Sequence, residues 1–376
     1  MDWRLEPSEY LPGPPADTDV AAFGIGLVGC GGIANGAHLP AFRKAGYRVV
    51  ACCDVVEAAA RGTAERWGIP FWTTDVRALL ARPEVKIIDM PLHPAARLDV
   101  LREIATAPRP VLSQKPLHME LARARELAAF AAEAGIPLAV NQQARWVPGH
   151  RALRLLMDRG AVGQVYAIHH LIRSFQDQAD TWSRTLPNFN IADHGVHYLD
   201  LCRYFAASPA AGRLEWERLH CTTAMLPDQL AVDPLIYSIN VEFGPAGGRE
   251  RLMASLQFNN VLRARQAHGY TWWIDGGEGS MWLTQGAGGS GWAGHVLHLA
   301  RADEPDVVHD MQIEGNWFPD AFQGPIGDLM SAVAHGREPA VTPRDNLHTV
   351  AMTTAAVLSS REGRVVQRDE VMGSGG

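Results

Sequence analysis

The stretch FGIGLVGCGGIANGAHLPAFRKAGYRVVACCD, residues 23–54, predicts the fold of the first third of the chain. It contains an apolar run at residues 24–28, a glycine-rich turn, a helical stretch, and a second apolar run at residues 48–53 that leads to Asp54. This order of strand, glycine turn, helix, strand and acid is typical of a unit that binds a dinucleotide. An ordinary βαβ turn is the alternative, and the agreement of strand, helix and spaced acid favours the dinucleotide.

Each residue of the turn has a physical role in this interpretation. Gly29 permits the tight turn, Gly31 lets the backbone approach a pyrophosphate, and Ala34 is small enough for the helix to pack on the strand. The helix N-terminus then directs unpaired N–H groups at the phosphates. Asp54 lies about 20 residues beyond the turn, where its carboxylate can accept a hydrogen bond from a ribose. The cofactor-binding residues expected in this stretch are Gly29, Gly31, Gly32, Ile33, Ala34 and Asp54.

The residues around Asp54 also bear on which nicotinamide cofactor is used. The Asp54 carboxylate would repel a 2′-phosphate, and Val55 and Val56 offer that phosphate no cation. We therefore expect NAD to be preferred over NADP.

Length and charge limit the class of protein. With 376 residues the chain is too long for one simple core, which predicts two domains. A formal net charge of −7 and scattered Lys and Arg residues give no reason to expect nucleic acid or a membrane as a partner. No apolar run reaches the ~18–20 residues that span a membrane, and the N-terminus lacks the regions of a signal peptide. We expect a cytoplasmic protein.

Cysteine and acidic residues give no indication of a metal site. The five cysteines are an odd number with no CxxC pair, which favours reduced structural thiols. Asp177, Asp180 and Asp193 match no cation-binding loop, and the adjacent His169 and His170 form no metal-ligand pattern. We therefore expect no metal.

The apolar pattern divides the chain into an arm and two domains. Residues 1–20, rich in proline and acids, are expected to form an extended arm. Residues 21–142 alternate strands with helices, which predicts an α/β domain with a doubly wound parallel sheet. Residues 143–372 contain many β-rich runs, which predicts an α+β domain on an open, mostly antiparallel sheet. Segments 322–335 and 346–361 should be helices that pack back onto the first domain.

Several separate stretches resemble the Gfo/Idh/MocA family, the glucose–fructose oxidoreductase and inositol dehydrogenase type. They are GLVGCGGIANGAHLPAF at residues 26–42, QKP at 114–116, NQQARWVPGH at 141–150, DHGVHYLD at 193–200, DGGEGSMWL at 275–283 and GREPAVTPRDNLHTV at 336–350. The resemblance covers nearly the whole chain after residue 22. It implies a nucleotide-binding domain followed by an open mixed sheet. It also implies a homo-oligomer, a dimer or a tetramer, that associates through the outer face of that sheet.

The resemblance assigns catalytic groups, because the lysine, aspartate and histidine of the family match Lys115, Asp193 and His197. The implied reaction is hydride transfer between a carbinol carbon and a nicotinamide. His197 is expected to act as general base, Lys115 to hydrogen-bond the reacting hydroxyl, and Asp193 to orient the substrate or share in the proton relay. The family commonly has Glu where this chain has Gln114, which keeps the hydrogen bonds but places no negative charge beside Lys115. On spacing alone, Asp193 as a helix N-cap and His197 as a core histidine stay open alternatives.

Other candidate residues follow the strands, where the carboxyl edge of a parallel sheet forms a crevice. Further cofactor contacts are expected from Pro91, His93, Gln114, Lys115 and Gln143. Aromatic faces and polar groups suit a sugar ring. Substrate contacts are expected from Lys115, Arg145, Trp146, His169, Trp182, Asn188, Asp193 and His197. Core or interface packing is the alternative for each tryptophan.

The leading functional hypothesis is an NAD-dependent dehydrogenase that oxidises a secondary hydroxyl of a sugar, glycoside or polyol. Oxidation at a ring carbon such as C3 is a specific form of it. A second enzymatic hypothesis recycles bound NAD, as in redox-assisted glycoside cleavage or epimerisation. A non-enzymatic hypothesis is an NAD-sensing regulatory protein, against which the presence of Lys115, Asp193 and His197 argues.

Overall fold

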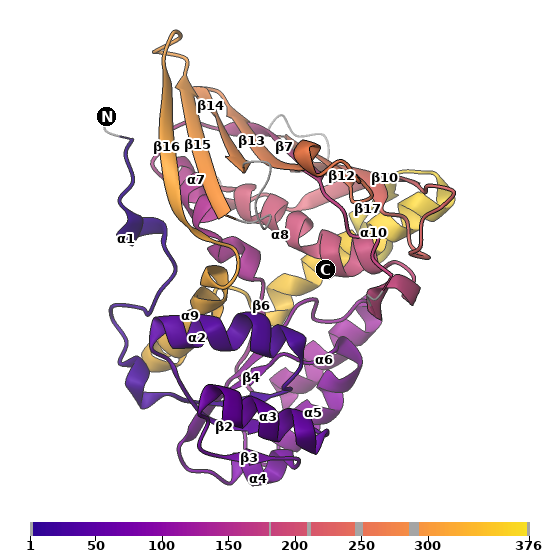
Figure 1. Ribbon diagram of the computed structural model, residues 1–376. Coiled ribbons are helices and arrows are strands. Elements are labelled where there is room, and N and C mark those ends of the chain that lie inside the picture. Colours follow the sequence, from indigo (N-terminus) through magenta and orange to yellow (C-terminus); the bar gives the residue numbers. More distant parts are fainter. Residues whose placement is uncertain (1–2, 180–181, 209–211, 245–250, 286–292, 374–376) are drawn as a thin grey trace. The chain divides into compact units, whose positions relative to one another are not determined.

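The first apolar run forms a fully buried strand, β1 (Gly24–Val28), in a computed structural model that describes residues 3–179, 182–208, 212–244, 251–285 and 293–373. The strand belongs to a six-stranded sheet of order β3-β2-β1-β4-β5-β6. Figure 1 labels β2, β3, β4 and β6 of this sheet. The other strands are β2 (Arg48–Cys53), β3 (Trp72–Thr73), β4 (Val85–Met90), β5 (Val111–Gln114) and β6 (Leu138–Asn141). All neighbouring strands run parallel, and the strand order reverses between β1 and β4. A ligand crevice is expected at such a reversal.

Helices cover both faces of this parallel sheet. Every residue of β1, β5 and β6 is buried, which requires cover on both sides. The helices after the strands are α2 (Leu39–Ala45), α3 (Glu57–Trp67), α4 (Val76–Leu80), α5 (Arg97–Ile104) and α6 (Leu121–Glu133). Shorter helical turns are η1 (Val20–Ala22), η2 (Ala34–His38), η3 (Pro94–Ala96), η4 (Gln143–Trp146) and η8 (Asp320–Phe322). The predicted doubly wound α/β fold is confirmed.

A later segment of the chain completes this fold. Residues 12–146 and 317–350 form one compact unit, here named the parallel-sheet unit. Within it, helix α9 (Gln323–His335) lies against the α2 region, where the Tyr47 hydroxyl donates to the carbonyl of Gln323 at 3.3 Å. Lys44 also pairs with the buried carboxylate of Asp320 at 2.5 Å. The prediction of a helix over residues 322–335 is therefore confirmed.

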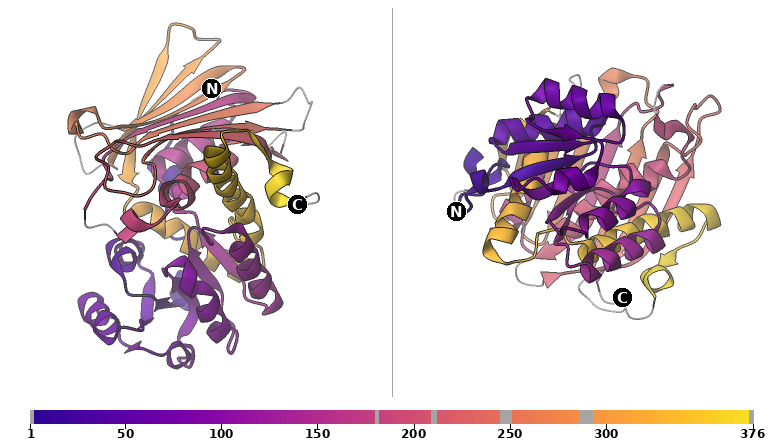
Figure 2. Two further views of the ribbon diagram at one scale, coloured as in Figure 1. Left: turned by 90° about the vertical axis from the view of Figure 1, so that its right-hand side faces the viewer. Right: turned by 90° about the horizontal axis from the view of Figure 1, so that it is seen from below.

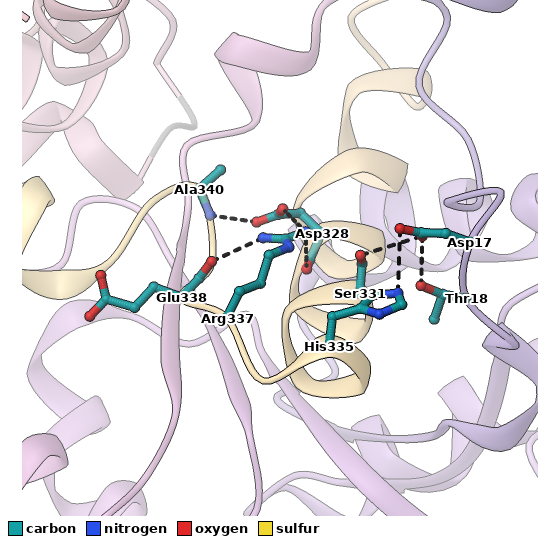
Figure 3. A network of polar contacts seen from close by, with 8 residues as sticks. All are labelled: Asp17, Thr18, Asp328, Ser331, His335, Arg337, Glu338 and Ala340. Carbon is teal, nitrogen blue, oxygen red and sulfur yellow. Dashed lines mark hydrogen bonds and ion pairs between the residues drawn. The ribbon is translucent and has the colours of Figure 1, made fainter. Parts of the chain in front are cut away.

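A polar network fastens α9 to the segment that precedes β1 (Figure 3). Asp17 contacts His335 at 3.3 Å and accepts a hydrogen bond from the Ser331 hydroxyl at 3.5 Å. On the same helix, Asp328 pairs with Arg337 at 2.8 Å and accepts the N–H of Ala340 at 2.6 Å. These contacts fix the entry to β1 and the exit from α9 within the same unit.

The other compact unit, here named the mixed-sheet unit, comprises residues 1–11, 147–316 and 351–376. Its nine strands have the order β16-β15-β14-β13-β7-β12-β11-β10-β17, and the β7–β12 pair is parallel while the other pairs are antiparallel. The strands are β7 (Val165–Arg173), β10 (Trp216–Ala224), β11 (Ile236–Phe243), β12 (Leu252–Asn259), β13 (Gly269–Gly276), β14 (Gly279–Gln285), β15 (Ala293–Arg301), β16 (Val308–Asn316) and β17 (Val366–Gln367). A separate two-stranded sheet joins β8 (Ala207–Ser208) and β9 (Gly212–Arg213). The predicted α+β class of this region is confirmed.

Helices gather on one face of the large sheet (Figure 2). They include α7 (Pro148–Asp158), η6 (Asn190–His194), α8 (Gly195–Phe205) and the residues of α10 (Pro343–Glu362) from 351 onward. The remaining helical elements are α1 (Pro7–Tyr10), η5 (Trp182–Thr185), η7 (Arg265–Ala267) and α11 (Arg368–Met372). Burial alternates along β7, because a strand directs successive side chains to opposite faces.

An aromatic core joins α8 to the covered face of the large sheet. The buried His170 ring of β7 stacks on Trp272 at 4.2 Å and on Tyr198 of α8 at 4.6 Å, measured between ring centroids. Burial lowers the pKa of His170 well below its usual value, which keeps the ring neutral. The neutral ring of His170 therefore packs in this core as an apolar aromatic side chain would.

Two further features of the structure concern the cysteines and the length of the apolar helices. All five cysteines are buried and free, as structural cysteines would be, and their reduced state stays a prediction. No helix within the described ranges is long and apolar enough to cross a membrane.

Candidate active site

The glycine turn follows β1 and has two kinds of glycine. Gly29 has a φ of 108°, and its N–H donates to the carbonyl of Cys53 at 2.8 Å. A Cβ at Gly29 would lie 2.8 Å from the side chain of Leu92, so a larger residue is excluded on both counts. Gly31 and Gly32 are exposed, and a Cβ on either would meet no atom within 4 Å.

The open space in front of Gly31 and Gly32 fits a dinucleotide pyrophosphate. The helix that begins here presents first-turn N–H groups that have no acceptor within a regular helix. Ile33 is 38% exposed beside this space, whereas Ala34 is fully buried in the core against β1. The residues present therefore fit the phosphates on the exposed side of the turn and close helix packing on the other.

Two side chains fix the shape of the turn. Asp54 accepts the N–H of Cys30 at 2.8 Å with one carboxylate oxygen and the N–H of Val56 at 2.9 Å with the other. Asn35 donates to the carbonyls of Cys30 and Gly31 at 2.8 and 3.1 Å, and accepts the indole N–H of Trp67 in α3 at 2.9 Å. Asn35 was not among the predicted site residues, because its side chain acts by donating to backbone carbonyls and by accepting from Trp67, which no local motif indicates.

The loops after β4 and β5 carry the next group of predicted residues. Pro91 is buried next to Gly29, and His93 is exposed at the start of η3, where its ring accepts the N–H of Ala95 at 3.4 Å. Gln114 is the buried last residue of β5, and the half-buried Lys115 follows it. The structure thus brings the loop after β4 to the glycine turn within the parallel-sheet unit.

One buried arginine joins these two loops. Arg97 of α5 is 1% exposed and donates to the carbonyl of Leu92 at 3.1 and 2.8 Å. It also donates to the carbonyls of Pro116 and Leu117. The guanidinium therefore holds the two residues that follow Lys115 and the loop after β4 in one arrangement. Sequence reasoning missed Arg97 because an arginine on a helix is usually a surface residue.

The carboxyl ends of β4 and β6 contain buried polar atoms with no partner. Within the described ranges these are Asp89 Oδ1, Asn141 Oδ1, Gln143 Oε1 and both side-chain polar atoms of Gln142. Buried polar groups are normally hydrogen-bonded, and exceptions in a native fold point to a ligand or an ordered water. Their position at the carboxyl edge of the parallel sheet supports a polar ligand at this edge.

Arg145 and Trp146, predicted to contact substrate, have structural partners in the parallel-sheet unit. Arg145 in η4 is 5% exposed and pairs with Asp345 at 3.2 Å. The Trp146 ring packs directly on the backbone of α9, where a Cβ at Gly324 would lie 1.8 Å from it. Both residues therefore hold η4 against the segment 317–350.

Asp193 and His197 lie where a wide helical turn joins α8 in the mixed-sheet unit. The N–H of Gly195 donates to the carbonyl of Asn190, which makes η6 a π-turn that contains Asp193. His197 follows in the first turn of α8 and is 7% exposed, whereas Asp193 is partly exposed. The inserted residue of a π-turn is a common feature of functional sites.

His194, between these two residues, belongs to a separate polar cluster. Its ring lies 3.2 Å from the Tyr237 hydroxyl, 3.3 Å from the Tyr198 hydroxyl and 3.2 Å from the side-chain nitrogen of Gln176. These contacts tie the π-turn to β11 and to the segment after β7.

Asn188 is held in a left-handed conformation just before this π-turn. Its φ is 63°, its N–H donates to Asp233 at 2.7 Å, and its side chain accepts from Arg361 at 3.0 Å. Burial raises the pKa of Asp233, against the lowering effect of the N–H groups of Asn190 and Asn188. Trp182 begins η5, and its side chain lies outside the described residues.

His169 lies on the exposed face of the large sheet. Its ring is 3.7 Å from Asp275, and the neighbouring His170 occupies the face that α8 covers. The structure therefore does not bring His169 to the face that carries Asp193 and His197.

The predicted residues fall into two groups, each described within its own unit. The parallel-sheet unit contains the glycine turn, Asp54 and Lys115, and the mixed-sheet unit contains Asp193 and His197. No cluster of three or more His, Cys, Asp or Glu residues in the described part of the chain is arranged to hold a metal ion.

The chain is similar to known oxidoreductases. Residues 23–142 match the family model GFO_IDH_MocA, described as an oxidoreductase family with an NAD-binding Rossmann fold. A D-apiose dehydrogenase of Paraburkholderia graminis is 26% identical over 361 residues, which cover 93% of this chain and 91% of the relative. An inositol 2-dehydrogenase of Rhizobium meliloti is 24% identical over 346 residues, with 91% and 98% covered.

A solved structure has the same fold over nearly the whole chain. It is an oxidoreductase from Agrobacterium radiobacter in complex with NAD+, L-tartaric acid and magnesium. Its TM-score is 0.78 at 19% sequence identity, and the match covers 93% of this chain and 100% of that one. At this identity the similarity establishes the fold.

Proposed function

We propose that this chain, whose residues 23–142 match the model of the Gfo/Idh/MocA oxidoreductase family, oxidises a secondary hydroxyl of a sugar, glycoside or polyol. Oxidation at a ring carbon such as C3 is the specific form that we favour. The observation that carries the proposal is the open glycine turn capped by Asp54, in one chain with Lys115, Asp193 and His197. The dehydrogenases of apiose and inositol among its relatives support the substrate class.

Three side chains perform the proton chemistry in this proposal. NAD, when bound, supplies the hydride acceptor for the hydrogen on the carbinol carbon. His197 takes the hydroxyl proton, since a histidine suits proton transfer near neutral pH. Lys115 donates a hydrogen bond to the substrate oxygen and stabilises its developing negative charge, and Asp193 orients the substrate. The products are a ketone, NADH and a proton.

We further propose that NAD is preferred over NADP. The two carboxylate oxygens of Asp54 are fixed by N–H groups of Cys30 and Val56, so the negative charge cannot turn away from a 2′-phosphate. The neighbouring Val55 and Val56 are 90% and 56% exposed and offer no positive charge.

The cofactor preference is testable by one double variant. We expect Asp54→Ser with Val55→Arg to raise the ratio of kcat/KM for NADP over NAD by at least about tenfold, which is ~1.4 kcal/mol. Steady-state kinetics with each cofactor measure this ratio. A wild-type protein that uses NADP as well as NAD would contradict the proposal before any variant is made.

We also propose that the chain forms a homo-oligomer through the outer face of the large sheet. Leu171, Met253 and Trp273 are 41%, 56% and 40% exposed on this face. Trp273 extends the apolar surface by stacking on Trp282, which stacks in turn on His298. Such a patch on a soluble protein indicates a protein interface.

A panel of sugars, glycosides, inositols and other polyols tests the proposed reaction. Net formation of NADH, followed by its near-ultraviolet absorbance, is the expected result with at least one substrate. Product formation without net NADH would favour recycled cofactor, as in cleavage or epimerisation. NAD binding without turnover on the whole panel would favour a regulatory protein.

A further inference from the structure

His38 lies behind the residue that precedes Lys115. It is the last residue of the π-turn η2, which follows the glycine turn and continues into α2, together the glycine-turn helix. His38 is 1% exposed. Its Nδ1 is 2.8 Å from Oδ2 of Asp89, which is fully buried near the end of β4. Its Nε2 is 3.0 Å from the side-chain nitrogen of Gln114 at the end of β5. One imidazole therefore connects the glycine-turn helix with two strand ends.

The hydrogen bonds around His38 determine which groups donate and which accept. Gln114 Oε1 accepts the backbone N–H of Lys115 at 2.7 Å, so the Gln114 amide nitrogen must be the group that faces His38. Asn141 directs a second amide nitrogen at the same Nε2, at 3.4 Å. An amide NH₂ group only donates, so Nε2 of His38 must accept. The single ring proton is then on Nδ1, where it is donated to Asp89.

The same geometry excludes the other proton arrangements. A proton on Nε2 would face the NH₂ group of Gln114 at 3.0 Å, and a doubly protonated ring would do the same. Rotation of the Gln114 amide would satisfy such a ring but would leave the N–H of Lys115 facing an NH₂ group. Asp89 thus selects the tautomer of His38, and that tautomer selects the orientation of Gln114.

We propose that His38, held by Asp89, is a positioning residue that orients Gln114 and thereby the backbone from which Lys115 projects. The relevance to catalysis rests on the proposed function of Lys115. The series of hydrogen bonds from Asp89 through His38 also explains the glutamine at position 114. A glutamate there would accept the N–H of Lys115 equally well, but it has no donor for Nε2 of a neutral His38.

A purely structural role for His38 makes a different prediction. Its ring packs against Phe322 and Phe42, with centroids 5.0 and 5.9 Å away. If packing were its only role, neither the proton position nor the Lys115 amide would respond to an isosteric change at Asp89 or Gln114. The test therefore reads the proton and the amide directly.

The sequence makes this measurement simple, because the chain has three lysines, Lys44, Lys86 and Lys115. Full-length protein with ¹⁵N-labelled lysine gives a small set of backbone amide signals, and ¹⁵N-labelled histidine reports the ring tautomers. Lys115→Arg assigns the first signal and His38→Phe the second. Melting temperature and NADH binding establish that each variant is folded.

Two isosteric substitutions have different expected results. Asp89→Asn can donate to Nδ1, which permits the Nε2–H tautomer, so Gln114 turns. The Lys115 amide then shifts and exchanges with solvent at least about tenfold faster, while the Lys44 amide does not change. Gln114→Glu keeps the Lys115 amide signal near its wild-type position and adds a second proton to His38. An Nε2–H tautomer in the wild type, or a Lys115 amide unchanged in Asp89→Asn, would overturn the proposal.

Steady-state kinetics test whether the hydrogen bonds from Asp89 through His38 to Gln114 affect turnover. With a substrate from the panel, Asp89→Asn should lower kcat by at least about tenfold while KM for NAD changes less than about twofold. An unchanged kcat overturns the positioning role even when the tautomer is as expected. The labelled spectra need no substrate, so failure to find a substrate would count against the proposed function and leave the spectral test decisive for the His38 chain.

Discussion

Gly29 and Gly31 are separated by one residue and are needed for different reasons. Gly29 has a positive φ, and a Cβ at this position would lie 2.8 Å from the Leu92 side chain, so a glycine is required by the fold. Gly31 has open space in front of it, so the fold does not require a glycine here. A bound phosphate would require one, because a side chain would occupy that space. The spacing in the sequence predicted both roles.

We expect alanine at these two positions to separate folding from binding. Gly29→Ala should lower the free energy of unfolding by about 1–3 kcal/mol, because a non-glycine residue is strained at this φ. Gly31→Ala should leave the melting temperature unchanged and weaken NADH binding at least about tenfold. Thermal unfolding and titration of NADH measure the two effects. Weaker folding in Gly31→Ala, with normal NADH affinity, would contradict this interpretation of the turn.

Other important residues are not visible in the sequence pattern. Asn35 and His38 each have a side-chain partner 28 or more residues away, and Arg97 donates to the carbonyl of Leu117 in another loop. A sequence motif records local spacing, whereas these contacts depend on which strand ends become neighbours. Gln114 was predicted to differ from its family in charge, and its partner His38 became apparent only from the folded chain.

At the level of elements, α5 carries the contact that organises the Lys115 loop. We expect Arg97→Lys to lower the free energy of unfolding by about 2–4 kcal/mol, because lysine cannot reproduce the fork that reaches carbonyls on both loops. Arg102→Lys on the same helix is the control, since Arg102 is exposed and pairs with Asp99. Its effect should stay within about 0.5 kcal/mol in denaturant unfolding. Equal effects of the two variants would contradict the assigned role of Arg97.

Strand β15 contains a histidine that should make the fold sensitive to acid. Burial lowers the pKa of His295 to about 4 from 6.5. Between these values the unfolded chain binds a proton that the folded chain does not, so stability falls as the pH falls through this window. The loss by about pH 4 is at most ~3 kcal/mol for this group.

His295→Leu should remove that part of the acid sensitivity. Denaturant unfolding over a series of pH values measures the slope for wild type and variant. Above pH 6.5 the two curves should run parallel, and below it the wild type should lose stability more steeply. Identical slopes in acid would show that His295 is not the group responsible.

The sequence pattern predicted that these helices exist but did not predict the irregular turns within them. The glycine-turn helix and the helix that carries His197 each begin with a π-turn, η2 and η6, which no periodicity in the sequence revealed. An inserted residue shifts the side chains beyond it around the helix, so the four-residue spacing of Asp193 and His197 does not by itself give their relative directions. Tertiary contacts such as those of His194 with Tyr237 and Tyr198 stabilise the wider turn.

At the scale of the whole molecule, both sheets were predictable because their patterns differ. Continuous apolar runs predicted the parallel sheet, and alternating runs predicted the large sheet with one covered face. Among the residues predicted to contact substrate, Arg145 pairs with Asp345, Trp146 packs on α9, and His169 lies on the exposed face of the large sheet, and a substrate contact of each stays a prediction. Residue type suggested a sugar contact, but type alone does not specify the face or partner of a side chain.

The exposed face of the large sheet predicts the assembly. Met253→Asp should convert the oligomer to a smaller species, because a charge in an apolar interface is costly to bury. Met225→Asp is a matched control, since Met225 is 48% exposed in the loop after β10, against 56% for Met253. Light scattering coupled to size-exclusion chromatography gives the mass of each. A monomeric wild type, or equal behaviour of both variants, would contradict the proposed interface.

Under the proposed function, this chain is a dehydrogenase whose proton chemistry depends on Lys115 and His197. The most direct test of this claim is the initial rate of NADH formation with the best substrate of the panel for wild type, Lys115→Ala and His197→Ala. Lys86→Ala, a change at an exposed lysine of β4, is the control. We predict that kcat/KM falls by far more than tenfold in both active-site variants and is unchanged in Lys86→Ala. A fall of less than about tenfold, roughly 1.4 kcal/mol, in either active-site variant would contradict the claim.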